Sequence, residues 1–136
     1  MVVLSNENEQ TLQPGQAISF DNVVTSAGCG ETARSGGPLG LTFPKAIYHV
    51  SFHGNVTGAT EALPVELSIA LGGSALPEAE MVYTPATANA VGNVSAGTYV
   101  VTRSGLSNQI TVINSGENPI IVSPNASLMA TAVRAL

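Results

Sequence analysis

Two histidines are the residues of this chain whose type and spacing most readily suggest chemistry. His49 and His53 lie four residues apart in a stretch that alternates apolar and polar side chains. On a strand that rises about 3.3 Å per residue, their imidazoles stand about 13 Å apart, too far for both to bind one metal ion. Three copies of His49 around an axis could supply one nitrogen ligand each, although packing and hydrogen bonding in an interface is the simpler interpretation. We therefore predict no metal site within one chain and no cofactor.

The chain offers little for nucleophilic catalysis, which needs a nucleophile, a base and a group that orients the base. Asp21 is the single aspartate, and no Gly-x-Ser-x-Gly motif is present. Cys29 lies in a glycine-rich stretch, and no spacing pairs it with a histidine. A lone cysteine excludes an intrachain disulfide and a thiolate zinc cluster, which leaves a free loop thiol or a cross-link between copies. We predict a protein that is not an enzyme.

Binding residues tend to lie on loops that a rigid scaffold holds in place. Residues 25–37 and 77–80 are the longest stretches predicted to be irregular. Glu78 and Glu80 in the second stretch are better explained as solvated charges than as calcium ligands. Tyr83 is the one aromatic residue outside the predicted core strands, so Tyr83, Glu78 and Glu80 are our candidates for a loop that contacts a glycan or a host surface protein. With three Phe, three Tyr and no Trp in the chain, a strong lectin is disfavoured.

The composition restricts the classes of partner. The formal net charge is −5, and Lys and Arg together number four, so no basic stripe can follow a phosphate backbone and nucleic acid is excluded as a partner. Only 10% of residues are charged and 44% are hydrophobic. Such a surface suits a chain that hides much of itself in an oligomer, although a bland monomer remains open. No apolar run approaches the roughly 20 residues of a membrane span, so no membrane insertion is expected.

The hydrophobic pattern predicts strands throughout, because alternation with a period of two recurs between Gly and Pro turns. We expect strands over residues 10–13, 17–24, 41–56, 64–71, 79–84, 87–96, 97–102, 109–113 and 127–136. Turn signals every eight to twelve residues are typical of a sandwich or jelly roll. We predict one all-β domain over residues 10–136, preceded by a polar lead-in over residues 1–9.

The last predicted strand has apolar residues on both of its faces, which is expected of a strand covered on both sides. Over residues 46–56, by contrast, Tyr48, Val50, Phe52 and Val56 form one apolar face, opposite Ile47 and the histidines. A monomeric sandwich would normally leave one face of its final strand in water. A central final strand and a surface that needs a partner are both indicated.

A family resemblance appears in residues 41–52, Leu-Thr-Phe-Pro-Lys-Ala-Ile-Tyr-His-Val-Ser-Phe. This run resembles the Phe-x-x-Pro-Gly-x-Tyr-x-Val-Ser-Phe signature of the tumour necrosis factor and complement globular-head superfamily, with Lys45-Ala46 before Ile47 in place of the usual glycine. Residues 97–101, 110–114 and 126–136 resemble later strands of that family in the right order. The closing residues are especially similar to the trimeric heads of bacterial collagen-like spore-surface (exosporium) glycoproteins and to related phage-encoded domains.

The resemblance implies a ten-strand jelly roll that assembles as a homotrimer around a three-fold axis. By the register of the family, the residues that face the axis would be Ile47, His49, Ser51, His53, Leu128, Ala130, Ala132, Arg134 and Leu136. Small side chains at Ala130 and Ala132 would let three chains approach closely.

The function that this implies is structural: a homotrimeric surface protein of a bacterial spore or phage particle that contributes stability and adhesion. The sequence starts without the basic and long apolar segments of a signal peptide. Spores and virions are assembled in the cytoplasm and released by lysis, which agrees with that observation. The alternative is a recognition module that binds carbohydrate or a host protein through loops at one end of the trimer.

Overall fold

The computed structural model describes residues 1–28, 30–33, 36–59 and 62–136. In this part of the chain it contains twelve strands and no helix, so nothing in it is a helix long and apolar enough to cross a membrane. The strands are β1 (Val2–Ser5), β2 (Gln10–Leu12), β3 (Asn22–Ser26), β4 (Glu31–Thr32), β5 (Leu39–Leu41), β6 (Ala46–Gly58), β7 (Val65–Leu71), β8 (Ser74–Tyr83), β9 (Gly92–Val101), β10 (Gln109–Asn114), β11 (Ile120–Val122) and β12 (Ser127–Ala135). The predicted all-β sandwich is confirmed.

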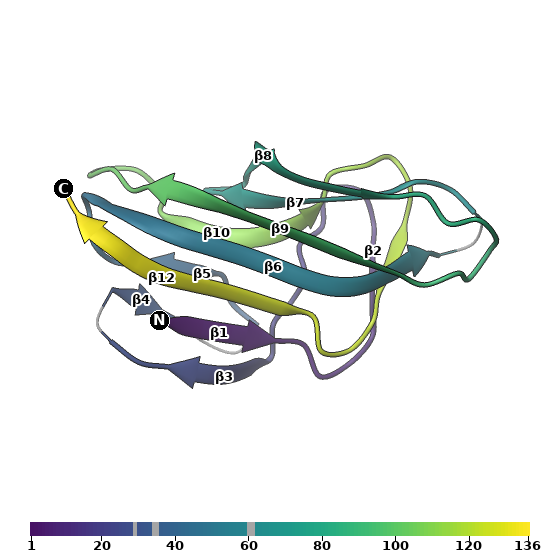
Figure 1. Ribbon diagram of the computed structural model, residues 1–136, viewed down its shortest axis with the longest axis horizontal. Coiled ribbons are helices and arrows are strands. Elements are labelled where there is room, and N and C mark those ends of the chain that lie inside the picture. Colours follow the sequence, from purple (N-terminus) through teal and green to yellow (C-terminus); the bar gives the residue numbers. More distant parts are fainter. Residues whose placement is uncertain (29, 34–35, 60–61) are drawn as a thin grey trace.

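Two antiparallel sheets form the sandwich. Sheet A has seven strands in the order β2-β11-β6-β12-β1-β3, with β9 paired to the other side of β6, and sheet B has the order β4-β5-β10-β7-β8. In Figure 1, β9, β6, β12, β1 and β3 run side by side across the front, and the strands of sheet B lie behind them. The final strand β12 lies between β6 and β1, so its predicted central position is confirmed.

Strand β6 is the longest element, with thirteen residues, and its inward and outward residues alternate from Ala46 to Val56. Its inward residues Tyr48, Val50, Phe52 and Val56 are buried in the core between the sheets, as the sequence predicts. Gly54 continues this inward row, where an added Cβ would lie 2.9 Å from the Cβ of Ala126. A glycine at this position therefore lets the turn before β12 pack directly against β6.

The family motif holds the start of β6 in place. The hydroxyl of Tyr48 donates a hydrogen bond to the carbonyl of Gly30 and accepts one from the backbone N–H of Phe43 at 3.2 Å. The hydroxyl of Thr102 accepts a bond from the N–H of Ala46 at 3.0 Å and donates one to the carbonyl of Phe43 at 2.6 Å. The loop before β6 is thus fixed by side chains from the core.

Two elements at the amino-terminal end differ from the prediction. Residues 1–9 are not only a lead-in, because β1 pairs with β12 on one side and β3 on the other. Val2 and Leu4 are buried in the core, and a strand of four residues that begins with consecutive apolar residues was too short to show this in the sequence. The predicted strand over residues 17–24 is also wrong. Only an isolated bridge from Ala17 to Ile113 remains, and the strand begins at Asn22.

Further along the chain the structure joins what the prediction separated. Residues 87–96 and 97–102 were expected as two strands, whereas β9 is one strand that pairs with β6 over ten residues. The ten strands implied by the resemblance become twelve because β2, β4, β5 and β11 are short strands of two or three residues.

Candidate functional site

The candidate site is the side of sheet A that faces away from the core, and β6 runs through its middle. Residues directly opposite each other in antiparallel strands point to the same side of the sheet. Strands β9 and β12 are the two neighbours of β6 in the sheet. Residues of both strands that pair with outward residues of β6 therefore lie on the same face as those residues. We call this surface the outer face; it comprises Ile47, His49, Ser51, His53, Ser95, Gly97, Tyr99, Val101, Ser127, Met129, Thr131 and Arg134.

The outer face has an apolar end and a polar end. At the apolar end, Tyr99 is 65% exposed and Val101 45%, and the neighbouring Val133 and Leu136 are 55% and 65% exposed. At the other end, His53 lies between Ser95 and Ser127. So many large exposed apolar groups on one surface are typical of a site where another protein binds.

On β6, the structure agrees with the predicted placement. Ile47, His49, Ser51 and His53 all lie on the outer face, and Ile47 and His49 are partly buried by their neighbours within the single chain.

On β12, the structure corrects the placement. Leu128 and Ala130 are fully buried in the core and pair with Phe52 and Val50, and Ala132 continues the same row by pairing with Tyr48. Met129 and Thr131, which alternate with them, lie on the outer face instead, opposite Ser51 and His49. The sequence could not show which face of β12 meets the core, because both faces of the strand carry apolar residues.

A shift in register near the end of β12 changes which of its residues point to the outer face. It lies between Ala132 and Arg134, after which Arg134 pairs with Ile47 and returns to the outer face. Extra residues of this kind in one strand of a pair are β-bulges. Arg134 therefore lies on the outer face beside Ile47, Leu136 is exposed beyond the strand end, and their contact with a trimer axis stays a prediction.

Sequence reasoning missed the contribution of β9. The rings of His49 and Tyr99 are in contact, with centroids 5.2 Å apart and planes at 58°. Val101 extends the surface beside Ile47. Tyr99, Val100 and Val101 are consecutive apolar residues, so the sequence did not show which of them points outward.

No group of three potential metal ligands occurs among the residues that the structure describes. His49 brings one imidazole per chain to the outer face, so a metal site shared by three copies stays a prediction.

A cleft of about 700 Å³ adjoins the apolar end of the outer face. Val101, Leu106 and Leu136 form its apolar walls, and Lys45 and Arg103 also line it. The cleft continues the apolar surface past the end of β9.

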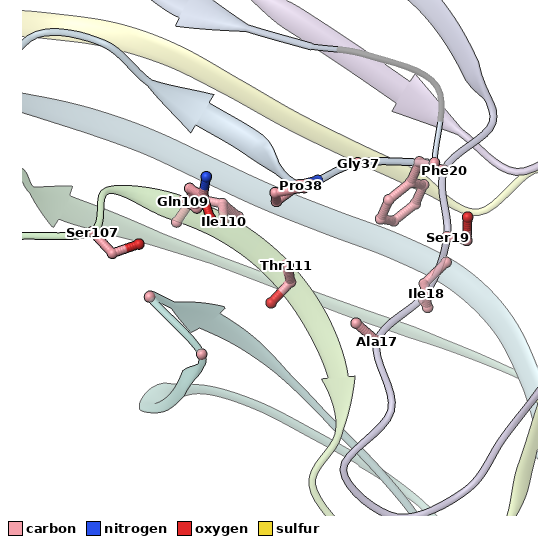
Figure 2. Close-up of a pocket in the computed structure, with 13 residues that line it drawn as sticks. Ala17, Ile18, Ser19, Phe20, Gly37, Pro38, Ser107, Gln109, Ile110 and Thr111 are labelled. Carbon is pink, nitrogen blue, oxygen red and sulfur yellow. The ribbon is translucent and has the colours of Figure 1, made fainter.

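A second concavity, of about 430 Å³, lies on the side of sheet B (Figure 2). Its lining has no charged residue and combines glycines and polar side chains with the apolar side chains of Ile18, Phe20 and Ile110. Gly36 and Gly37 come from the predicted irregular stretch, Gln109 and Thr111 from β10, and Ser19 from the segment before β3.

The candidate ligand loop at residues 77–83 is not a loop. Glu78 and Glu80 lie within β8 and are exposed, and Tyr83 is its last residue. The Tyr83 ring packs against the core, its hydroxyl donates to the carbonyl of Ala90 at 3.3 Å, and an added Cβ at Gly92 would lie 2.3 Å from the ring. Tyr83 therefore closes the end of β8 against β9.

Cys29 lies outside the described residues, so both interpretations of its thiol stay open.

The comparisons with known proteins agree with this architecture. The globular domain of zebrafish complement 1qA matches with a TM-score of 0.70 and 12% identity, over 99% of this chain and 98% of that chain. Eiger TNF from S. frugiperda matches with a TM-score of 0.71 and 6% identity, over 99% and 94%. Murine APRIL matches with a TM-score of 0.63 and 14% identity, over 97% of each chain. No family model and no curated protein matches the sequence. Identities this low establish a shared fold, and the predicted resemblance is confirmed at that level.

Proposed function

We propose that this chain, which has the jelly-roll fold of the tumour necrosis factor and C1q globular-head proteins, is a non-enzymatic structural protein that assembles as a homotrimer through its outer face. The observation that carries the proposal is the apolar end of that face, where Tyr99, Val101, Val133 and Leu136 are exposed in the single chain. Burying them stabilises an assembly by about 25 cal/mol for each Å² of apolar surface removed from water.

The size of the outer face supports an interface between folded proteins. Three strands of about ten residues, at about 3.3 Å per residue and 4.8 Å between strands, cover roughly 480 Å². The shorter β1 and β3 extend the same sheet and add roughly 150 Å². The total is of the same order as the roughly 800 Å² that each partner contributes to a standard interface.

The sparse charge of the chain favours a partner of the same kind. The strands that form and extend the outer face, β9, β6, β12, β1 and β3, contain no aspartate and no glutamate. A basic partner would find no carboxylate there to pair with. A second copy offers the same exposed Tyr, Val and Leu side chains, and the family resemblance implies three copies.

The solution mass tests this proposal. Light scattering coupled to size-exclusion chromatography at pH 7.5 is expected to give a mass near three chains of 13.8 kDa each. The mass of a single chain across the accessible concentration range would overturn the proposed assembly.

We place the trimer on the surface of a bacterial spore or a phage particle, where it contributes stability and adhesion. This placement rests on the resemblance to trimeric spore-surface heads and related phage-encoded domains. Antibody labelling of purified spores or virions under the electron microscope, read together with the neighbouring genes, tests it. The absence of labelling on both particles would contradict the proposed location but would not affect the proposal of a homotrimer.

The concavity on sheet B favours one alternative, a recognition module for carbohydrate or a host protein. An uncharged lining of glycine backbone, Ser19, Gln109 and Thr111 suits a neutral polar ligand such as a sugar. Titration of the isotope-labelled protein with neutral mono- and disaccharides would show shifts confined to these residues if the alternative holds.

A further inference from the structure

The outer face carries charge of only one sign. All residues of the five strands that form and extend it are described by the structure, and none is aspartate or glutamate. Their ionisable side chains that can become positive are His49, His53 and Arg134. A positive charge added to this face is therefore not compensated by any Asp or Glu side chain of the five strands.

The side chains around His49 are aromatic, neutral or positively charged. Strand β9 places Tyr99 against it, β12 places Thr131 opposite it, and Arg134 lies further along β12 beside Ile47. The ring of Tyr99 is itself mostly exposed. An assembly that covers this face would remove water from around the His49 ring, and burying a positive charge there without a partner costs free energy.

The surroundings of His53 are uncharged. Ser95 of β9 and Ser127 of β12 lie opposite it. Beyond it on the face, the amide of Asn93 donates to the side-chain oxygen of Asn55 at 3.1 Å. Hydroxyl and amide groups satisfy a neutral imidazole well but do not compensate a buried positive charge.

The carboxylates nearest to this surface lie elsewhere. Glu31 lies beside β12, where it accepts the N–H of Ala132 at 2.9 Å and forms an ion pair with the Met1 amino group at 3.1 Å. Glu78 and Glu80 belong to β8 of sheet B. At the apolar end, the charged side chains that line the adjoining cleft are Lys45 and Arg103, which add positive charge.

We propose that protonation of His49 and His53 dissociates the assembly, so that the trimer is stable at neutral pH and separates in acid. This inference rests on the proposed self-association through the outer face. It adds that the face works as an acid-sensitive interface, because each copy brings imidazoles and an arginine to it and the five strands bring no Asp or Glu side chain.

The sign follows from the linkage between protonation and assembly. The free chain binds protons on these imidazoles more readily than the assembled chain does, so lowering the pH favours the free chain. The assembly is therefore expected to be tight at neutral pH and to weaken in acid. If assembly weakens proton binding tenfold at each of three His49 side chains, the trimer dissociation constant rises by up to about a thousandfold in acid.

The experiment compares the solution mass of the full chain at pH 7.5 and pH 5.0 over the same concentrations. We expect three chains at pH 7.5 and a shift towards one chain at pH 5.0, with circular dichroism showing unchanged β structure at both. The double variant H49Q/H53Q should keep the mass of three chains at pH 5.0. The variant R134Q is the matched control, because it removes a permanent charge from the same face and should leave the dependence on pH in place.

The outcomes separate this inference from the assembly itself. A single chain at pH 7.5 would overturn the proposed assembly and this inference with it. Three chains at both pH values would overturn the acid sensitivity alone, as would assembly that tightens in acid because carboxylates of a neighbouring copy meet the imidazoles. Dissociation of H49Q/H53Q in acid to the same extent as the wild type would assign the effect to other groups. If H49Q/H53Q fails to assemble at pH 7.5, the single variants are compared, and an unchanged pH midpoint in both would also overturn the inference.

Discussion

At the scale of residues, one motif performs a structural task. Tyr48 packs its ring against Phe43, with centroids 6.4 Å apart, and its hydroxyl connects the loop before β6, at Phe43, to the backbone before β4, at Gly30. Because the hydroxyl is buried, its loss leaves the N–H of Phe43 without that acceptor. The aromatic signature thus fixes where β6 begins and, through β6, where the outer face begins.

The variant Tyr48→Phe is expected to lower the free energy of unfolding by about 1–2 kcal/mol, because it removes two buried hydrogen bonds and keeps the packing. Tyr83→Phe is the matched control, since its hydroxyl makes one longer bond in a half-buried position. Urea denaturation of both variants measures the difference. Equal losses in the two variants would contradict the role given to Tyr48.

A second buried residue shows what side-chain hydrogen bonds contribute away from the motif. Asn6 is fully buried, donates to the carbonyls of Asn8 and Ser123 at 3.0 Å each, and accepts the N–H of Ala126 at 2.8 Å. It connects the end of β1 to the segment before β2 and to the turn between β11 and β12. Nothing in the sequence distinguishes this asparagine from the exposed ones around it.

At the scale of elements, β12 does two different things along its length. Its first half supplies Leu128 and Ala130 to the core, and its last residues, beyond the register shift, pair with Ile47 and Ala46 and are exposed. The strand therefore belongs to the fold at one end and to the outer face at the other.

Deletion of residues 133–136 should separate these two roles. It removes Val133, Arg134 and Leu136 from the apolar end but leaves the core residues of β12 in place. We expect retained β structure by circular dichroism with a lower melting temperature, and a solution mass that falls from three chains to one. A deleted protein that still has the mass of three chains would show that assembly does not use the apolar end.

At the scale of the whole molecule, the two sheets carry different candidate surfaces. Sheet A presents the outer face and sheet B carries the uncharged concavity on its own side. Assembly through sheet A would therefore leave the concavity of each copy open. The architecture accommodates the structural proposal and the recognition alternative together.

The variant Tyr99→Lys tests this division. It places a permanent charge at the most exposed aromatic of the outer face, beside His49 and without a carboxylate in reach on that face, so the mass should fall to that of one chain. Val82→Lys is the control, because Val82 is similarly exposed but lies on β8 opposite Glu66. A retained three-chain mass in Tyr99→Lys, or its loss in Val82→Lys, would place the interface elsewhere.

The sequence by itself determined the sandwich, the core face of β6 and half of the outer face. Tyr48, Val50 and Phe52 alternate with Ile47, His49 and Ser51 so cleanly that only one phase buries the apolar set. The resemblance of residues 41–52 to the superfamily signature then indicated the jelly roll. Short-range alternation was sufficient here because one face is polar enough to need water.

Tertiary structure alone decided the other half. On β12, apolar residues on both faces give two equally good phases, and the choice is made by pairing Leu128 with Phe52 and by the later register shift. Tyr99 joins the outer face only because β9 pairs with β6 over ten residues. The period-two pattern fixes which residues share a face of one strand, but the face that meets the core depends on the partner strand, and that partner is distant in the sequence.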